Sequence, residues 1–109
     1  MIQPTASFKD NLRLVPSIKD LNGIEVLGPS RTVVARIDNI PGKQGSLAVY
    51  QYLAQNFSTL DADAASHGIA VFAEHTEDAK NHPGVHPNID LLLGIIAGGA
   101  PLTIRVLKS

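Results

Sequence analysis

The chain has 109 residues, of which 44% are hydrophobic and 17% are charged, and its formal net charge is −1. This size and composition fit one folded domain, and the nearly balanced charge offers no broad field to attract nucleic acid or an anionic membrane. The absence of cysteine excludes disulfides, zinc–thiolate sites, iron–sulfur clusters and cysteine nucleophiles.

The beginning of the chain predicts a short arm followed by a short helix. Residues 1–6 carry no periodic pattern and are expected to form a flexible arm. Ser7 is a residue type that caps helices, and Pro16 ends the pattern that follows it. Between them, apolar side chains recur at helical spacing, at Phe8, Leu12 and Val15.

Three strands are expected, two near the N-terminus and one at the C-terminal end. Ile24 and Val26 alternate with polar positions, and after a Gly-Pro-Ser turn the same alternation continues through residues 33–37. This pattern predicts a β-hairpin with one largely polar face. The final alternating run, residues 102–106, predicts the third strand.

Three further helices are predicted between the hairpin and the last strand. Ser46 is the expected N-cap of the first, and Asp61 is the expected cap of the second. The second helix should end by about Asn81, because a residue that precedes proline avoids helical angles. The third should begin near Pro87 and end at the Gly98-Gly99 pair.

Together these elements predict a single α+β domain over residues 1–109. Its core is a small, three-stranded, largely antiparallel sheet, formed by the N-terminal hairpin and the C-terminal strand and covered by about four helices. The first eight residues have neither a basic start nor an apolar stretch, so we expect no signal peptide. The longest apolar run, residues 89–100, is shorter than a membrane span requires. We therefore expect a cytoplasmic protein with no membrane or nucleic-acid partner.

The first candidate site is a glycine- and lysine-containing loop that precedes a predicted helix. Free backbone N–H groups at a helix start, next to a lysine, can hold an anion. The candidate anion-binding residues are Gly42, Lys43, Gly45 and Ser46. The spacing fits neither a Walker loop nor a dinucleotide fingerprint. The alternative is that the glycines turn the chain and the serine only caps the helix.

The second candidate site is a stretch that holds three of the four histidines. His75, Asp78 and His82 would share one edge of a continuous helix, with His86 following, and such a set would suit zinc or a ferrous ion. Because Pro83 should end the helix early, we expect the imidazoles to spread apart, in an ordinary helix end. A third alternative is acid–base chemistry by His75 or His86, oriented by Asp78 or Asp90.

A third candidate feature is the apolar helix expected after Pro87. Leu91 and Ile95 lie four residues apart, nearly opposite the apolar face expected to enter the core. A helix that is apolar on both sides is either enclosed or covered by a partner. A homodimer through these two side chains is one expectation, and an enclosed helix is the other.

The stretches "PGKQGSLAVY", "AVFAEHTEDA" and "HPNIDLLLGII" resemble those of a family of small bacterial proteins known only as a domain of unknown function. The resemblance extends from Phe8 to Val106. It implies a soluble, bacterial, cytosolic protein, and it supplies no activity, cofactor or catalytic residue.

The functional prediction is a binding or interaction domain that recognises a small anionic ligand or a protein partner. No serine, threonine or cysteine nucleophile lies in a recognised motif, so no catalytic residue is assigned and no cofactor is required. The alternative is a small enzyme that uses a metal ion or a histidine acid–base pair.

Overall fold

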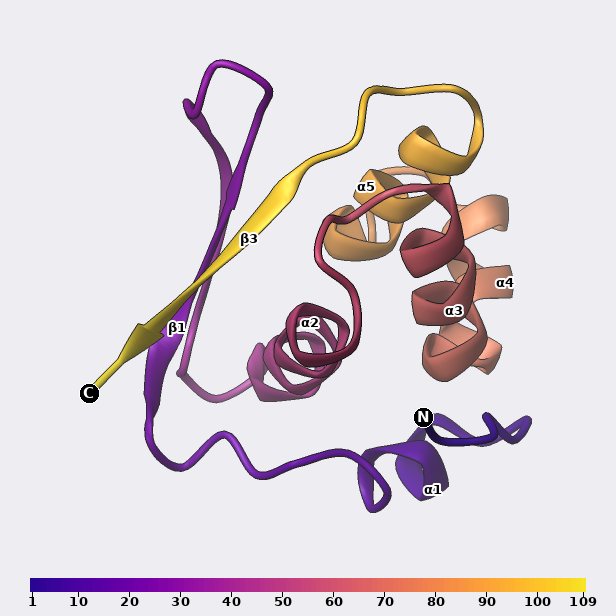
Figure 1. Ribbon diagram of the computed structural model, residues 1–109. Coiled ribbons are helices and arrows are strands. Elements are labelled where there is room, and N and C mark those ends of the chain that lie inside the picture. Colours follow the sequence, from indigo (N-terminus) through magenta and orange to yellow (C-terminus); the bar gives the residue numbers. More distant parts are fainter.

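The computed structural model describes all residues from 1 to 109 and contains five helices and three strands. The strands form one antiparallel sheet in the order β2-β1-β3 (Figure 1). The prediction of an α+β domain built on a hairpin and a C-terminal strand is confirmed. The elements are α1 Phe8–Leu12, β1 Leu21–Leu27, β2 Val33–Asp38, α2 Gln44–Asn56, α3 Ala62–Phe72, α4 Glu74–Asn81, α5 Pro87–Ile96 and β3 Thr103–Lys108.

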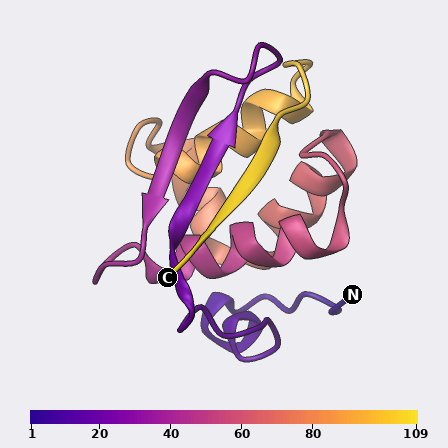
Figure 2. The same cartoon turned by 60° about the vertical axis from the view of Figure 1, so that its left-hand side comes forward.

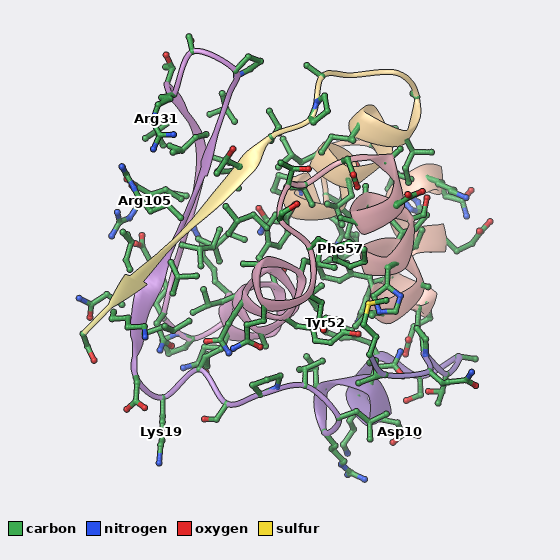
Figure 3. All side chains as sticks on the ribbon, viewed as in Figure 1. Asp10, Lys19, Arg31, Tyr52, Phe57 and Arg105 are labelled. Carbon is green, nitrogen blue, oxygen red and sulfur yellow. The ribbon has the colours of Figure 1, made fainter.

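The helices lie on one face of the sheet, and its other face is open to solvent (Figures 1 and 2). Helix α2 contacts all three strands, α3 packs against α2 and α5, and α4 and α1 lie farther from the sheet. Tyr52 points into the interior while Lys19 and Arg31 project outward (Figure 3). The core therefore lies between the sheet and the helices. Crossing a bilayer would need a longer apolar helix than any of these five provides.

The open face of the sheet is polar, as the alternation in the hairpin predicts. Glu25 in the central strand receives hydrogen bonds from Arg105 of β3 and lies 3.4 Å from Arg36 of β2. The hydrogen bond from Arg105 is the main cause of a lowered pKa at Glu25. These cross-strand pairs explain why this face needs no covering layer.

Two of the three predicted helix caps are confirmed. The Ser7 hydroxyl accepts a hydrogen bond from the backbone N–H of Asp10, and the Asp61 carboxylate accepts one from Ala64. The prediction for Ser46 is wrong, because α2 begins at Gln44 with Lys43 in the cap position, three residues before the predicted cap, and has no side-chain cap. Ser46 therefore lies inside the first turn, with its hydroxyl free for other partners.

The predicted continuous helix from Asp61 to about Asn81 is wrong in its middle, although its end at Asn81 is confirmed. Ala73 has a φ of 53° and separates α3 from α4. The Thr76 hydroxyl donates to the Ile69 carbonyl at 2.7 Å, in addition to the hydrogen bond that this carbonyl accepts from the Ala73 backbone N–H, and so ties the start of α4 to the end of α3. No glycine or proline marks this position, so periodicity alone does not reveal it.

Helix α5 buries one of the two side chains that a homodimer was expected to use. Ile95 is only 5% exposed and belongs to the hydrophobic core. Leu91 is partly buried and packs against that core. Ile95 therefore fits the enclosed alternative, whereas an interface through Leu91 stays a prediction. Pro87 at the first turn and Gly98 with a φ of 116° delimit the helix as predicted.

The N-terminal arm, residues 1–6, has no regular secondary structure but is tied to the helices at two points. The Ile2 backbone N–H donates to the Tyr52 hydroxyl at 3.0 Å. The Thr5 backbone N–H donates to the side-chain oxygen of Asn11 at 2.8 Å, and the Asn11 amide donates to the Val71 carbonyl. Asn11 is fully buried, so it fixes the position of α1.

Candidate functional site

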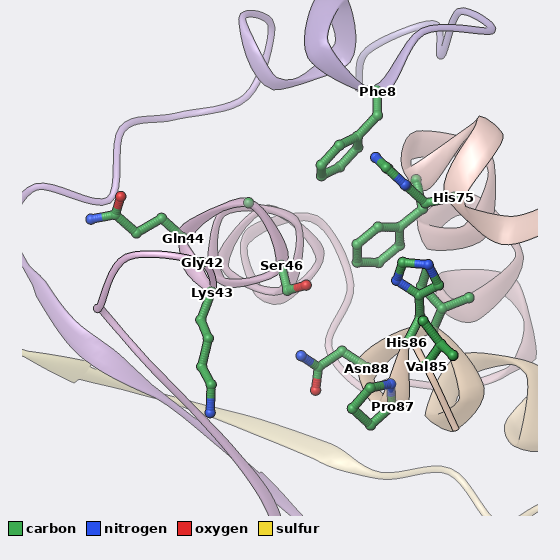
Figure 4. A pocket seen from close by; sticks show the side chains of 13 residues that line it. Phe8, Gly42, Lys43, Gln44, Ser46, His75, Val85, His86, Pro87 and Asn88 are labelled. Carbon is green, nitrogen blue, oxygen red and sulfur yellow. The ribbon is translucent and has the colours of Figure 1, made fainter. Parts of the chain in front are cut away.

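A cavity of about 540 Å³ lies between α1, the start of α2, the α3–α4 junction and the segment that leads into α5 (Figure 4). Its lining includes residues 42–46, which form the predicted anion-binding loop. It also includes His75 and His86 from the histidine stretch. Two segments that are more than 25 residues apart in the sequence therefore meet at one site.

The polar wall of the cavity is the beginning of α2. The backbone N–H groups of Gln44, Gly45 and Ser46 have no acceptor within the chain, as is normal for a first helical turn. Ser46 and Asn88 point toward the cavity, whereas the Lys43 side chain, although the residue lines the cavity, extends away from the histidines (Figure 4). The amides and the serine hydroxyl are thus better placed to contact a ligand than the lysine ammonium.

The start of α5 is held against α2 by Tyr50. Its hydroxyl donates to the Asn88 carbonyl at 2.5 Å, and its ring is fully buried. Burial raises the pKa of Tyr50 well above its usual range, so the hydroxyl stays protonated and keeps its donor role. This bond fixes the backbone that carries Asn88 beside the cavity.

Asp78 joins two of the histidines. Its Oδ2 lies 2.6 Å from His86 Nε2 and its Oδ1 lies 3.1 Å from His82 Nδ1. The hydrogen bond from His86 is the main cause of a lowered pKa at Asp78. The expectation that the imidazoles spread apart is wrong for His82 and His86. The loop after α4 folds back over the helix end and brings both imidazoles to the Asp78 carboxylate.

The two histidines that are hydrogen-bonded to Asp78 differ in position. The His86 side chain is 28% exposed and lines the cavity, whereas the His82 side chain is 64% exposed and lies outside it. His75 lines the cavity, and its ring centre is 5.6 Å from that of His86. Among the histidines, only His86 is both oriented by a carboxylate and directed at the cavity.

Asp90, the other carboxylate considered for orienting a histidine, has a different partner. It accepts a hydrogen bond from the Gly84 backbone N–H at 2.9 Å. Gly84 has a φ of 94°, which favours glycine. Asp90 therefore holds the loop that returns His86 to Asp78.

The proposed metal ligands do not form a coordination geometry. His75, Asp78, His82 and His86 are near one another, but no group of three or more histidine or carboxylate side chains is arranged so that it could hold a metal ion. Asp78 instead uses its two oxygens to bind one imidazole each. This arrangement suits proton transfer better than coordination.

The apolar wall of the cavity contains residues that the sequence did not mark as functional. Phe8 from α1 points into the cavity, and the buried Phe72 stacks on it with ring centres 5.4 Å apart. The backbone N–H of Phe8 donates to the Glu74 carboxylate at 2.7 Å, which anchors α1 and lowers the pKa of Glu74. In the sequence Phe8 appears only as an apolar helix position, so its role was not predictable.

Comparison with known proteins gives one family. The family model described as an uncharacterized protein conserved in bacteria, DUF2322, matches residues 8–106. The chain belongs to this family. No curated protein and no solved structure matches the chain. The DUF2322 description states no activity.

Proposed function

We propose that the protein binds a small molecule carrying a carboxylate or phosphate group in this cavity. The observation that supports it most directly is that residues 42–46 and the histidine stretch line one cavity. Its volume of about 540 Å³ is within the usual range of roughly 300–1,000 Å³ for small-molecule sites. A cytoplasmic location, which a cysteine-free chain allows, is part of the same proposal.

The anionic group would bind at the first turn of α2. There the unbonded N–H groups of Gln44, Gly45 and Ser46 and the positive end of the helix dipole favour negative charge. The Ser46 hydroxyl adds a donor, because it does not cap the helix. Lys43 also lines the cavity, but it contributes longer-range attraction, since its side chain extends away from the histidines.

Titration of ¹⁵N-labelled protein with inorganic phosphate and with acetate tests this proposal by NMR. We expect saturable shifts at Gln44, Gly45 and Ser46, and weaker binding in Ser46→Ala than in Lys43→Ala. Lys19→Ala is the matched control, because Lys19 is exposed and does not line the cavity. Unchanged amide shifts at residues 44–46 with both anions would overturn the proposal.

A second candidate function is acid–base catalysis at the same site, and the Asp78–His86 pair favours it. A carboxylate that binds one imidazole nitrogen leaves the other free to accept or donate a proton. We propose His86 as the proton-transferring group and Asp78 as its positioning residue. Deuterium incorporation next to the carbonyl of 2-oxo acids in D₂O is a direct assay. Exchange that persists in His82→Gln but not in His86→Gln would support it, and no exchange above the buffer rate would argue against it.

A further inference from the structure

Four rings form a continuous wall on one side of the cavity. Phe8 contacts Phe72 at 5.4 Å between ring centres and His75 at 5.0 Å, and His75 contacts His86 at 5.6 Å. All four residues line the cavity. They come from α1, the end of α3, the start of α4 and the residue before α5, so the fold gathers them from four separate places.

The geometry of this wall leaves ring surface for a ligand. Phe8 and Phe72 are nearly parallel, at 19°, whereas Phe8 and His75 meet edge to face, at 86°. Phe8 is only half-buried and points into the cavity (Figure 4). Aromatic rings attract other rings in offset-stacked or edge-to-face arrangements, beyond the effect of buried area.

The rest of the lining is more polar and includes the Ser46 hydroxyl and the Asn88 amide, and the Phe8 ring adjoins the first turn of α2 at Gly45 (Figure 4). A molecule in the cavity therefore has ring surface available next to the hydrogen-bonding groups of the first turn of α2. We infer that the ligand carries an aromatic ring next to its anionic group, as an arenecarboxylate or an aryl phosphate does. This inference rests on the proposed function, because it specifies the ligand of that cavity.

Matched pairs of probes test the inference. Benzoate and cyclohexanecarboxylate have the same charge and the same number of non-hydrogen atoms, as do phenyl phosphate and cyclohexyl phosphate. We expect the aromatic member of a pair to bind about two- to tenfold more tightly, which is the usual size of a ring–ring contribution. Ring-current shifts of its protons by NMR should accompany binding.

The outcomes separate this inference from the proposed function. Equal affinity within both pairs would overturn the aromatic preference and leave the anion-binding proposal standing. No binding of any probe would overturn both. Tighter binding of the aromatic member in only one pair would support the inference and would identify the anionic group as a carboxylate or a phosphate.

Variants locate the effect on the ring wall. Phe8→Leu keeps an apolar side chain but removes the ring, so the affinity ratio within a pair should fall toward one while the cyclohexyl probe still binds. Phe57→Leu is the control, since the ring of Phe57 lies near His67 and not in the cavity. If Phe8→Leu loosens α1, His75→Gln removes a neighbouring ring without changing that helix. A ratio unchanged in both Phe8→Leu and His75→Gln would contradict the inference.

Discussion

Asp78 Oδ2 and His86 Nε2 are 2.6 Å apart although eight positions separate the two residues. The contact exists because α4 ends at Asn81 and the following loop turns back, with Gly84 at a φ of 94°. It places one carboxylate at the point where α4, the loop and α5 meet. The titration of Asp78 is therefore a direct measure of whether this arrangement is present in solution.

We expect the pKa of Asp78 to be below its usual value and to rise toward it in His86→Ala. His82→Ala should have a smaller effect, because the hydrogen bond from His86 is the largest cause of the shift. A lowered pKa in the folded state means that the stabilisation is present above about pH 4 and is lost as the pH falls through the folded-state pKa. Carboxyl ¹³C NMR across an acid titration measures both variants. An equal effect of the two substitutions would contradict the assigned order.

The second prediction concerns the neutral form of His67. Its Nε2 lies 2.6 Å from the Tyr52 hydroxyl, and burial, followed by the charge of the N-terminal amino group, lowers its pKa. The unfolded chain binds this proton near pH 6.5, before the folded protein does. This group therefore makes the free energy of unfolding decrease as the pH falls from about 7 toward the folded-state pKa.

Urea denaturation at a series of pH values between 8 and 5 measures this slope. His67→Gln keeps an acceptor for Tyr52 but cannot take up a proton, so its stability should vary less with pH. A slope that is the same in His67→Gln as in the unsubstituted protein would refute the assignment.

The third prediction compares two glycines with opposite surroundings. A Cβ on Gly23 would lie 2.4 Å from the backbone oxygen of Ile37, so Gly23→Ala must displace β2 from β1. A Cβ on Gly94 meets nothing within 4 Å. We expect Gly23→Ala to destabilise by about 1–3 kcal/mol or more, and Gly94→Ala, in a helix, to stabilise by up to about 1 kcal/mol. Thermal unfolding of the pair checks both signs, and a neutral Gly23→Ala would show that the strand pair is less tightly packed than described.

The sequence predicts most of the fold because its periodic signals are local. Alternation marks β1, β2 and β3, and Pro87 and Gly98 mark the ends of α5. The break at Ala73 carries no such signal. At this break the Thr76 side chain bonds to the Ile69 carbonyl and α4 packs against α5, and the pattern of apolar residues shows neither contact.

The candidate site is predictable only in part, for the same reason. Each segment that lines the cavity shows its own chemistry in the sequence, as the Gly-Lys loop and the histidines do. Their meeting depends on how α2 and α5 pack, and the contribution of Phe8 depends on α1 being anchored by Asn11 and Glu74. No local sequence pattern indicates any of these long-range contacts.

The last prediction separates the two sides of α5. Ile95 is 5% exposed and Ile96 is 38% exposed, so the same substitution in adjacent residues has different consequences. Ile95→Ala should cost about 2–5 kcal/mol, because it leaves a cavity in the core, whereas Ile96→Ala should change stability by no more than about 0.5 kcal/mol. Urea denaturation measures both. Similar losses in the two variants would mean that the helix is rotated from the described orientation. A concentration-dependent mass by light scattering that Leu91→Asp abolishes would instead place a dimer contact on this face.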